Sequence, residues 1–277
     1  MTSREDDALA RAAVAALTGQ LALAPKPGLP DPRDLAARST RREHDSLRWS
    51  AKALVPGLAA MAAAARRAGE ATPLLRAELG AIGRCTEHSV GLAGGGHKGA
   101  LWALGFLVAA VALDPGAKAL EVAVNTRKIA AFNDKGAPRR PSRGSSISVK
   151  YGAAGARGEA RAGFPHVRRA LDTLATARTA GATENQARLD ALLTVMSTLQ
   201  DTELLYTAGP LGLRQVQAGA RAVLEAGGTS TEAGAQALAA LDTDLHARAW
   251  SPRGSAGLLA GALFLDSLPV NSLAGAA

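Results

Sequence analysis

The sequence predicts an all-α fold, with residues 1–277 forming a single compact multi-helix domain with long Gly/Pro-rich loops. Apolar residues recur at helical spacing along most of the chain, and no run of alternating β-branched residues appears. Apolar residues make up 47% of the sequence, but aromatic residues only 3%. The core must therefore be built mainly from Ala, Leu and Val, and Ala and Leu are strong helix formers.

The periodic pattern predicts helices that follow one another along nearly the whole chain. Pro73 and Pro165 each suit the first turn of a helix, where the missing N–H is not needed, and Gly227 suits a helix end. The stretch from Ala100 to Leu113 is apolar throughout and is expected to be a buried helix. The predicted ranges are 6–22, 44–68, 73–89, 99–113, 120–131, 165–180, 183–198, 211–226, 231–247 and 255–267.

Two irregular segments interrupt the helices. Residues 24–40 are rich in proline, and residues 133–158 carry Lys and Arg among Gly, Ser and Pro. Long irregular segments inside a compact domain tend to be functional loops or linkers. Helices of similar character continue on both sides of residues 133–158. We therefore expect a basic loop within one domain, either folded over a ligand or mobile.

Composition and charge narrow the function classes. The formal net charge of +8 suits an anionic ligand, although the Arg-rich and Ala-rich usage also fits a GC-rich genome. Nucleic-acid binding through residues 133–150 is disfavoured, because aromatic residues for stacking are few and no recognition motif is present. The one cysteine, Cys85, excludes an internal disulfide and a cysteine-based zinc site, and it fits a reducing cytoplasm. The acidic N-terminus argues against a signal peptide, and the apolar run 99–113 is shorter than the ~20 residues that span a bilayer.

The glycine-rich stretch from Gly91 to Gly99 is the strongest functional signal. It contains Gly96, His97 and Lys98 directly before the apolar helix. Glycine lets backbone N–H groups approach a ligand, and a helix start adds unpaired N–H donors and a positive dipole end. His97 and Lys98 would complete a site for phosphate oxygens. The alternative is a glycine-rich turn that caps a buried helix, and the spacing is not that of a Walker A motif.

Two earlier motifs place His, Lys and Asp near helix boundaries. Lys26 could contact a phosphate and Asp31 a metal or hydroxyl, or both could be solvated charges on a stiff helix stop. We expect His44 to open the next helix, with Asp45 or Ser46 as its cap. His44 could ligate Mg²⁺ indirectly or move a proton, or it could be polar surface.

Three later motifs carry polar side chains among glycines or at helix ends. Arg157 offers a planar fork for phosphate, and Glu159 could balance it, coordinate a cation or act as a base. The alternative is an Arg157–Glu159 surface pair of little energetic value. Asp201 suits a metal or ribose contact, or else caps the next segment. Ser251 and Ser255 resemble an anion-holding turn before the last helix, with ordinary serine capping as the alternative.

In this order, the motifs resemble the triphosphoribosyl-dephospho-CoA synthase family, whose members serve citrate lyase and malonate decarboxylase. The resemblance covers about residues 21–268. Where the family has Asn-Thr before its His-Lys/Arg-Gly, this chain has Gly95-Gly96. The matching stretches are 25–29 with Asp31, the His44 region, 97–100 with 102–105, 155–160 with 163–165, 201–202, 212–213 and 215–217 with 227–228, and 251–252 with 254–256 and 258–260.

The resemblance implies an all-α fold and a pentosyl transfer. The 2′-hydroxyl of 3′-dephospho-CoA would attack C1′ of the ribose of ATP, adenine would leave, and the triphosphate would stay on the transferred ribose. The product would be the prosthetic-group precursor of an acyl carrier protein. The end of the chain, residues 263–268, favours the malonate decarboxylase branch.

The resemblance also implies roles for the motif residues. Glu159 or Asp201 would supply the base and electrostatic help for an oxocarbenium-like state, and His97 is the third residue expected to be catalytic. The triphosphate of ATP would lie against Lys26, His97 and Lys98, with the planar fork of Arg157 as a further contact. Mg²⁺ would be held by Asp31 and Asp201. The residues expected to bind ATP or the acceptor offer a positive charge, a hydroxyl, an imidazole or a free N–H, and they are Lys26, His44, Gly96, Lys98, Arg157 and Ser255.

Two other functions stay open at this point. A divergent member of the family could use a different acceptor, because the altered loops could reshape the acceptor site. A helical protein could also have kept the fold and the adenine-nucleotide site while losing the chemistry. The sequence leaves open whether the chain forms a homo-oligomer.

Overall fold

The computed structural model describes residues 2–34, 38–138 and 140–269, and these form helices, turns and loops without a β-strand. The predicted all-α class is confirmed. The elements are α1 (Arg4–Leu21), the 3₁₀ helix η1 (Pro32–Asp34), α2 (Arg38–Lys52), α3 (Val55–Ala68), α4 (Pro73–Leu92), α5 (Lys98–Leu113), α6 (Ala119–Ala131), α7 (Arg143–Tyr151), α8 (Gly155–Arg161), α9 (Pro165–Thr179), α10 (Glu184–Met196), α11 (Thr202–Thr207), α12 (Gly209–Glu225), α13 (Glu232–Ala247) and α14 (Arg253–Asp266).

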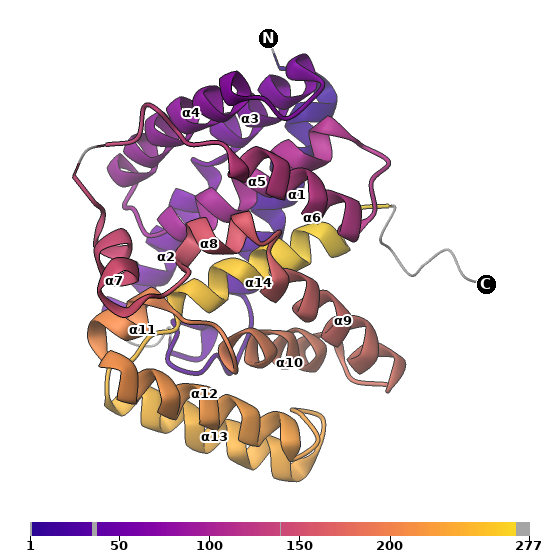
Figure 1. Cartoon of the computed structure of the whole chain (residues 1–277). Coiled ribbons are helices and arrows are strands. Elements are labelled where there is room, and N and C mark those ends of the chain that lie inside the picture. The colour runs from indigo at the N-terminus through magenta and orange to yellow at the C-terminus, as the bar shows by residue number, and fades with distance from the viewer. Residues whose placement is uncertain (1, 35–37, 139, 270–277) are drawn as a thin grey trace.

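Two apolar helices, α5 and α14, cross the middle of the molecule (Figure 1). Every residue of α14 from Ser255 to Leu265 is buried. Small residues let the two helices approach closely, since a Cβ on Gly257 would lie 3.4 Å from the Cα of Ala100. α3 and α6 pack on α5, and α1 and α9 pack on α14, so the core consists mainly of Ala, Leu and Val.

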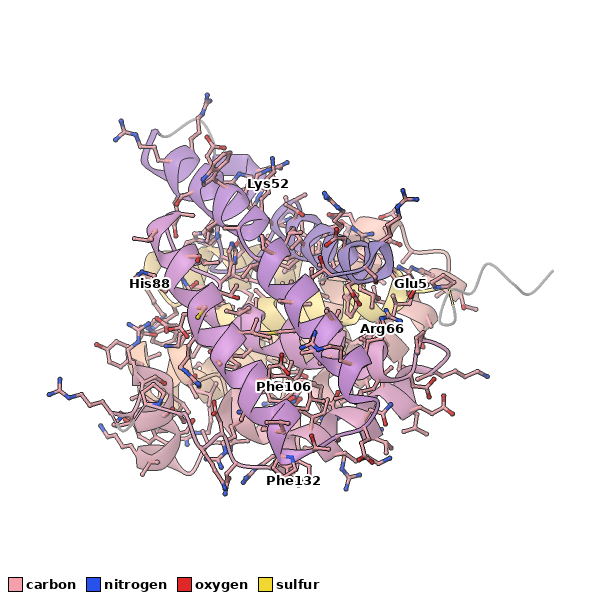
Figure 2. The ribbon with its side chains drawn as sticks, turned by 90° about the horizontal axis from the view of Figure 1, so that it is seen from above. Glu5, Lys52, Arg66, His88, Phe106 and Phe132 are labelled. Carbon is pink, nitrogen blue, oxygen red and sulfur yellow. The ribbon has the colours of Figure 1, made fainter. Side chains whose placement is uncertain are left out.

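The outer helices cover this pair on several sides. α3 and α4 lie together at the top of Figure 1, and α12 and α13 form a helical hairpin at the bottom. Arg66 ties α3 to α1 through Glu5 and Asp6, at 3.0 Å from each carboxylate, and Figure 2 shows Glu5 and Arg66 side by side. None of the described helices combines the length and the apolar character that a bilayer span requires.

The single helix predicted over 44–68 is wrong. Two helices occupy this range, and the second begins at Val55 with Pro56 in its first turn. Proline has no N–H to continue the hydrogen-bond ladder, and its ring clashes with the preceding turn, so a continuous helix must break there. His44 consequently lies inside α2, which already begins at Arg38, so the expected helix start and its cap at Asp45 or Ser46 are also wrong.

Residues 133–158 are not one irregular loop either. They contain α7 and the beginning of α8. The Ser142 hydroxyl caps α7 by accepting a hydrogen bond from the Ser145 N–H, and Gly152 ends it with a φ of 65°. The short helix α11 was likewise not predicted. Serine capping and a glycine stop define α7 locally, although its sequence has little apolar periodicity.

Candidate active site

The glycine-rich loop between α4 and α5 lies against α2. Gly94, Gly95 and Gly96 have φ angles of 105°, 71° and 105°, a region that residues with a side chain rarely adopt. The Oγ of Ser50 donates a hydrogen bond of 2.8 Å to the carbonyl of Gly95. A Cβ on Gly96 would lie 2.6 Å from the Leu47 side chain. The loop therefore needs glycine both for its backbone angles and for its contact with α2.

A cavity of about 210 Å³ opens between this loop and α4. Nζ of Lys98 lies 2.5 Å from Oε1 of Glu87, and 56% of the Lys98 side chain stays exposed. The N–H groups of the first turn of α5 have no carbonyl partner within the helix. The predicted residues Gly96, His97 and Lys98 thus meet at one cavity with donors suited to a phosphate. The cavity is lined by Glu87, Val90, Gly91, Gly95, Gly96, His97, Lys98 and Leu101.

Two of the predicted histidines are buried, His97 before α5 and His44 in α2, and each contacts a backbone carbonyl. Nε2 of His97 lies 2.7 Å from the carbonyl of Leu47, and Nε2 of His44 lies 3.3 Å from the carbonyl of Leu21. Burial lowers the pKa of His97 and the charge of Arg253 lowers it further, while the Leu47 hydrogen bond opposes both. A neutral His97 whose Nε2 donates to Leu47 keeps Nδ1 as an acceptor. Nδ1 of His44 is buried and forms no hydrogen bond within the described parts of the chain.

The proline-rich segment buries both of its candidate residues. Only 1% of Lys26 and 0% of Asp31 is exposed, so the alternative of solvated charges is wrong. Nζ of Lys26 donates to the carbonyl of Gln20 at 3.2 Å, and the Lys26 N–H donates to Asp31 at 2.9 Å. Burial lowers the pKa of Lys26 to about 8, with the charge of Asp31 opposing. Lys26 is therefore still largely protonated at neutral pH, and an anion bound beside it would raise its pKa again.

Asp31 is held by Arg33. Nε and Nη2 of Arg33 lie 2.9 Å and 2.6 Å from Oδ2 of Asp31, and Nη2 also reaches Asp242 at 2.7 Å. Burial by itself would raise the pKa of Asp31, but hydrogen bonds from Arg33 and from the Lys26 N–H outweigh it and lower the pKa. Both carboxylate oxygens of Asp31 are thus occupied by N–H donors.

Asp201 joins the beginnings of α11 and α14. Its Oδ1 accepts the Glu203 N–H at 2.9 Å, and its Oδ2 accepts the Ser255 N–H at 3.0 Å. The predicted capping role is therefore present, and it serves two helices at once. Asp201 is almost wholly buried, which raises its pKa, and the N–H donors around it oppose that rise. A Cβ on Gly254 would lie 2.9 Å from Asp201, so glycine makes room for the carboxylate.

Glu159 and Arg157 do not pair with each other, so the alternative of an Arg157–Glu159 surface pair is wrong. Nη2 of Arg157 donates to Asn133 at 2.7 Å. Glu159 is 5% exposed, and its Oε1 lies 2.7 Å from Nδ1 of His166. Oε2 of Glu159 and Nε2 of His166 are buried and form no hydrogen bond in the part of the chain that the structure describes. Glu159 and His166 therefore form a buried acid–base pair, in which one carboxylate oxygen and one ring nitrogen have no hydrogen-bond partner among the described residues.

His166 was missed by sequence reasoning. It follows Pro165 in the first turn of α9, and it meets Glu159 only because the chain reverses at Gly163 and Phe164, with φ angles of 74° and 51°. A positive φ is unusual for phenylalanine, so the turn could not be predicted from the residue type. The conjunction of Gly163 with Pro165 was the one available signal of a reversal.

The beginnings of α5, α8, α11 and α14 lie near one another. Asp201 connects α11 to α14, and Gly257 of α14 backs onto Ala100 of α5. A Cβ on Gly155, at the beginning of α8, would lie 3.8 Å from the Thr202 side chain. Figure 1 shows α11 beside the first turn of α14. Several positive helix ends thus share one region, which suits a polyanion.

Other contacts extend this region toward α2 and the proline-rich segment. Nη2 of Arg253 donates to Glu43 at 3.1 Å, which links α14 to α2. A Cβ on Gly28 would lie 2.2 Å from the carbonyl oxygen of Trp250, so the proline-rich segment borders the connection into α14. Within the ranges that the structure describes, Arg157 and Glu159 form no hydrogen bond or ion pair with the glycine-rich loop or with Asp201.

The donor set does not fit a magnesium ion held by protein carboxylates. In residues 2–34, 38–138 and 140–269, no three His, Cys, Asp or Glu side chains gather as metal ligands. Asp31 and Asp201 both bind N–H groups, which occupy the oxygens that a metal would need. The metal role predicted for these two residues gains no support from this geometry and stays a prediction.

The chain is similar to known proteins over nearly its full length. A family model described as ATP:dephospho-CoA triphosphoribosyl transferase matches residues 6–275. A probable 2-(5″-triphosphoribosyl)-3′-dephosphocoenzyme-A synthase of Stutzerimonas stutzeri is 46% identical over 265 residues, which cover 94% of this chain and 91% of that protein. Proteins with the same name from Pseudomonas putida and Azotobacter vinelandii are each 45% identical, covering 94% of this chain and 94% and 93% of those proteins. No solved structure matches.

Proposed function

Because the chain belongs to the ATP:dephospho-CoA triphosphoribosyl transferase family, and is thus a transferase, we propose that it acts on ATP and 3′-dephospho-CoA. The family match over residues 6–275 is the main support, since that range includes each predicted site residue. The proposed product is 2-(5″-triphosphoribosyl)-3′-dephospho-CoA, with free adenine as the second product.

The reaction exchanges one bond at C1′ of ATP for another. The bond from C1′ to the adenine nitrogen breaks, and a bond from C1′ to the 2′-oxygen of the acceptor forms. The acceptor hydroxyl loses its proton to a base, and the departing adenine nitrogen gains one. Such a displacement passes through an oxocarbenium-like state, which nearby negative charge stabilises.

We assign the base to Glu159. Its Oε2 is buried without a partner among the described residues, while Oε1 is fixed by His166 at 2.7 Å. A carboxylate with one oxygen anchored and the other free is suited to accept a proton from a bound hydroxyl. Asp201 acts in this scheme as a positioning residue, because it holds Ser255 and the start of α14 in place.

The triphosphate is assigned to the cavity beside the glycine-rich loop. Lys98 offers a half-exposed ammonium, and Gly96 and His97 offer backbone N–H groups at the start of α5. Lys26 adds a buried amine whose pKa of about 8 would rise beside a phosphate. His44 of α2 is proposed as a further polar contact, because its buried Nδ1 has no partner among the described residues. Mg²⁺ would enter as the ATP complex, with its charge balanced by phosphate oxygens.

We further propose that the product serves an acyl carrier protein of a malonate decarboxylase. The support is the sequence of residues 263–268, which resembles that branch, and residues 263–265 are buried at the end of α14. This finer assignment is independent of the transfer chemistry. A chain that served citrate lyase would carry out the same reaction.

The purified protein, incubated with Mg²⁺, ATP and 3′-dephospho-CoA, should release adenine and form a compound with the mass of the triphosphoribosyl adduct. Coenzyme A, which carries a phosphate on the 3′-oxygen next to the attacking hydroxyl, serves as the comparison acceptor. Adenine without the adduct would point to another acceptor. Binding of ATP without turnover would instead indicate a nucleotide-binding protein and refute the proposal.

A further inference from the structure

Four arginines gather around one carboxylate where α4, α8 and the connection after α6 meet. We call Arg76, Arg84, Arg157 and Arg161 the arginine cluster. Nη1 of Arg84 lies 2.6 Å from Oδ2 of Asp134, and Nη1 of Arg76 lies 3.6 Å from the same oxygen. Arg76 and Arg84 come from α4, whereas Arg157 and Arg161 lie one turn apart on α8.

The charges of this cluster are not balanced. Nη2 of Arg157 and Nη2 of Arg161 both donate to the neutral Oδ1 of Asn133, at 2.7 Å and 3.1 Å. Neither forms an ion pair with a carboxylate of the described residues, and Asp134 is the only carboxylate there that pairs with Arg76 or Arg84. Guanidinium groups stay charged at all physiological pH values. A strong excess of positive charge therefore remains at this place.

Asp134, the carboxylate within the cluster, packs closely against the backbone of α4. A Cβ on Gly80 would lie 2.2 Å from Oδ2 of Asp134, so the carboxylate sits directly on the α4 backbone. Oδ1 of Asp134 accepts the Gly136 N–H at 2.9 Å, which fixes its orientation. A Cβ on Gly136 would lie 2.6 Å from Arg84, so glycine at this position leaves room for that guanidinium beside Asp134.

Arg76 lies deepest and is the least satisfied member. Its guanidinium packs over the ring of Phe106 at 5.2 Å, and Figure 2 labels that ring. Its side chain is 14% exposed, and its buried Nη1 donates no hydrogen bond within the described parts of the chain. Burial lowers the pKa of Arg76, and the neighbouring charges of Arg157, Arg84 and Arg161 lower it further, while Asp134 opposes. An anion placed between the two helices would relieve this repulsion.

A cavity of about 670 Å³ adjoins the cluster at Arg161. Arg127 and Lys128 of α6 also line it, and both are exposed and form no ion pair among the described residues. Arg157 and Arg161 are exposed as well, so the cluster is open to solvent at its outer end. The cavity is lined by Val124, Arg127, Lys128, Ala131 and Arg161.

We propose that the arginine cluster binds a diphosphate group and that, given the proposed function, this group belongs to the acceptor 3′-dephospho-CoA. Lys98 at the glycine-rich loop pairs with Glu87 of α4, whereas Arg76 lies eleven residues earlier on the same helix. That separation corresponds to roughly 16 Å along the helix axis. A transferase that holds two polyphosphate substrates at once needs two such places. This assigns Arg157 to the acceptor, whereas the sequence had placed it with ATP.

The test is direct binding to the full-length protein, measured by titration calorimetry with three separate probes: inorganic pyrophosphate, 3′-dephospho-CoA and Mg-ATP. The variants are Arg157→Gln and Arg161→Gln. Both side chains are exposed, so we expect the variants to fold, and thermal melting checks this directly. Arg214→Gln, an exposed arginine of α12, is the charge-matched control.

We expect each cluster variant to lower the affinity for pyrophosphate and for 3′-dephospho-CoA at least tenfold. The affinity for Mg-ATP should stay within twofold of the wild type, and the control should bind all three probes as the wild type does. Unchanged affinity for pyrophosphate and 3′-dephospho-CoA would overturn the site. A comparable loss of affinity for Mg-ATP would overturn the assignment to the acceptor and would indicate that the cluster binds the triphosphate of ATP. Because no turnover is needed, a protein without transferase activity could still show arginine-dependent binding, so the two proposals can fail separately.

Discussion

Nδ1 of His166 lies 2.7 Å from Oε1 of Glu159, and the side chains are only 13% and 7% exposed. The two residues belong to different helices, α9 and α8, and a tight turn brings them together. An imidazole that donates to one carboxylate oxygen fixes the rotamer of the carboxylate and leaves the other oxygen free. This is the arrangement expected of a positioned general base.

Glu159→Gln should lower kcat by about 100-fold or more, because the amide keeps the shape of the side chain but cannot accept the proton. The measurement is the rate of adenine release at saturating ATP and acceptor. Glu225→Gln, at an exposed position of α12, removes the same charge and should keep the wild-type rate. A Glu159→Gln variant that folds normally and keeps more than half of the rate would refute the assignment.

His166→Leu tests the positioning role of the imidazole. The carboxylate should remain but lose its anchor, so kcat should fall about 10-fold, while KM for ATP stays within twofold. A purely structural role would instead lower the melting temperature and leave kcat of the folded fraction unchanged. His246→Leu, also paired with a carboxylate but on α13, is the matched control.

Lys26 should make the free energy of unfolding depend on pH. Burial lowers its pKa from 10.5 in the unfolded chain to about 8 in the folded protein, so the unfolded chain binds more protons between these values. The free energy of unfolding should therefore rise from about pH 8 to about pH 10.5, by about 3 kcal/mol in total. Urea titrations across this range measure it.

Lys26→Met should remove that rise, because the variant has no proton to release. Lys52→Met, at an exposed lysine of α2, should keep the pH dependence of the wild type. The same rise in Lys26→Met as in the wild type would show that another group titrates there.

Gly96→Ala should destabilise the protein by about 1–3 kcal/mol, because alanine at a φ of 105° is strained and its Cβ meets Leu47. Gly99→Ala, only three residues later, is the control, since a Cβ there meets nothing within 4 Å and its φ is ordinary for a helix. Its free energy of unfolding should stay within about 0.5 kcal/mol of the wild type. Equal losses in both variants would contradict the loop geometry.

Asp201→Ala should lower the free energy of unfolding by about 2–4 kcal/mol, because it removes the cap of α11 and leaves the buried Ser255 N–H without an acceptor. Asp244→Ala removes only an exposed i,i+4 pair with Arg248 and should cost less than about 0.5 kcal/mol. Chemical denaturation of both variants gives the comparison. A small loss in Asp201→Ala would mean that water replaces the carboxylate.

The sequence predicted the elements whose signals are local and missed those that depend on contacts. The helix 99–113 matches α5 to within one residue, because a long apolar run has few other solutions in an all-α core. The break before α3 was also a local signal, carried by Pro56, but the surrounding apolar pattern concealed it. α7 was missed because its serines and lysine give no apolar stripe.

The candidate site likewise contains residues that a local motif predicts and residues whose partners come from distant helices. Gly96, His97 and Lys98 are neighbours in sequence, so their shared cavity followed from the motif itself. The partners of Asp201 and Glu159 come from α14 and α9, and no spacing rule predicts that Ser255 or His166 would face them. The contact of Arg33 with Asp31 is local, two residues apart, and was overlooked, whereas its contact with Asp242 in α13 has no signal in the sequence.

The proposed transfer is tested most directly by the ratio of free adenine to adduct in a single-turnover reaction of the wild-type protein with ATP and 3′-dephospho-CoA. We expect one adenine for each triphosphoribosyl adduct, with no ADP or AMP formed. Products that carry adenine still joined to ribose, such as ADP or AMP, would show that the C1′ bond is not the one broken and would contradict the proposed transfer.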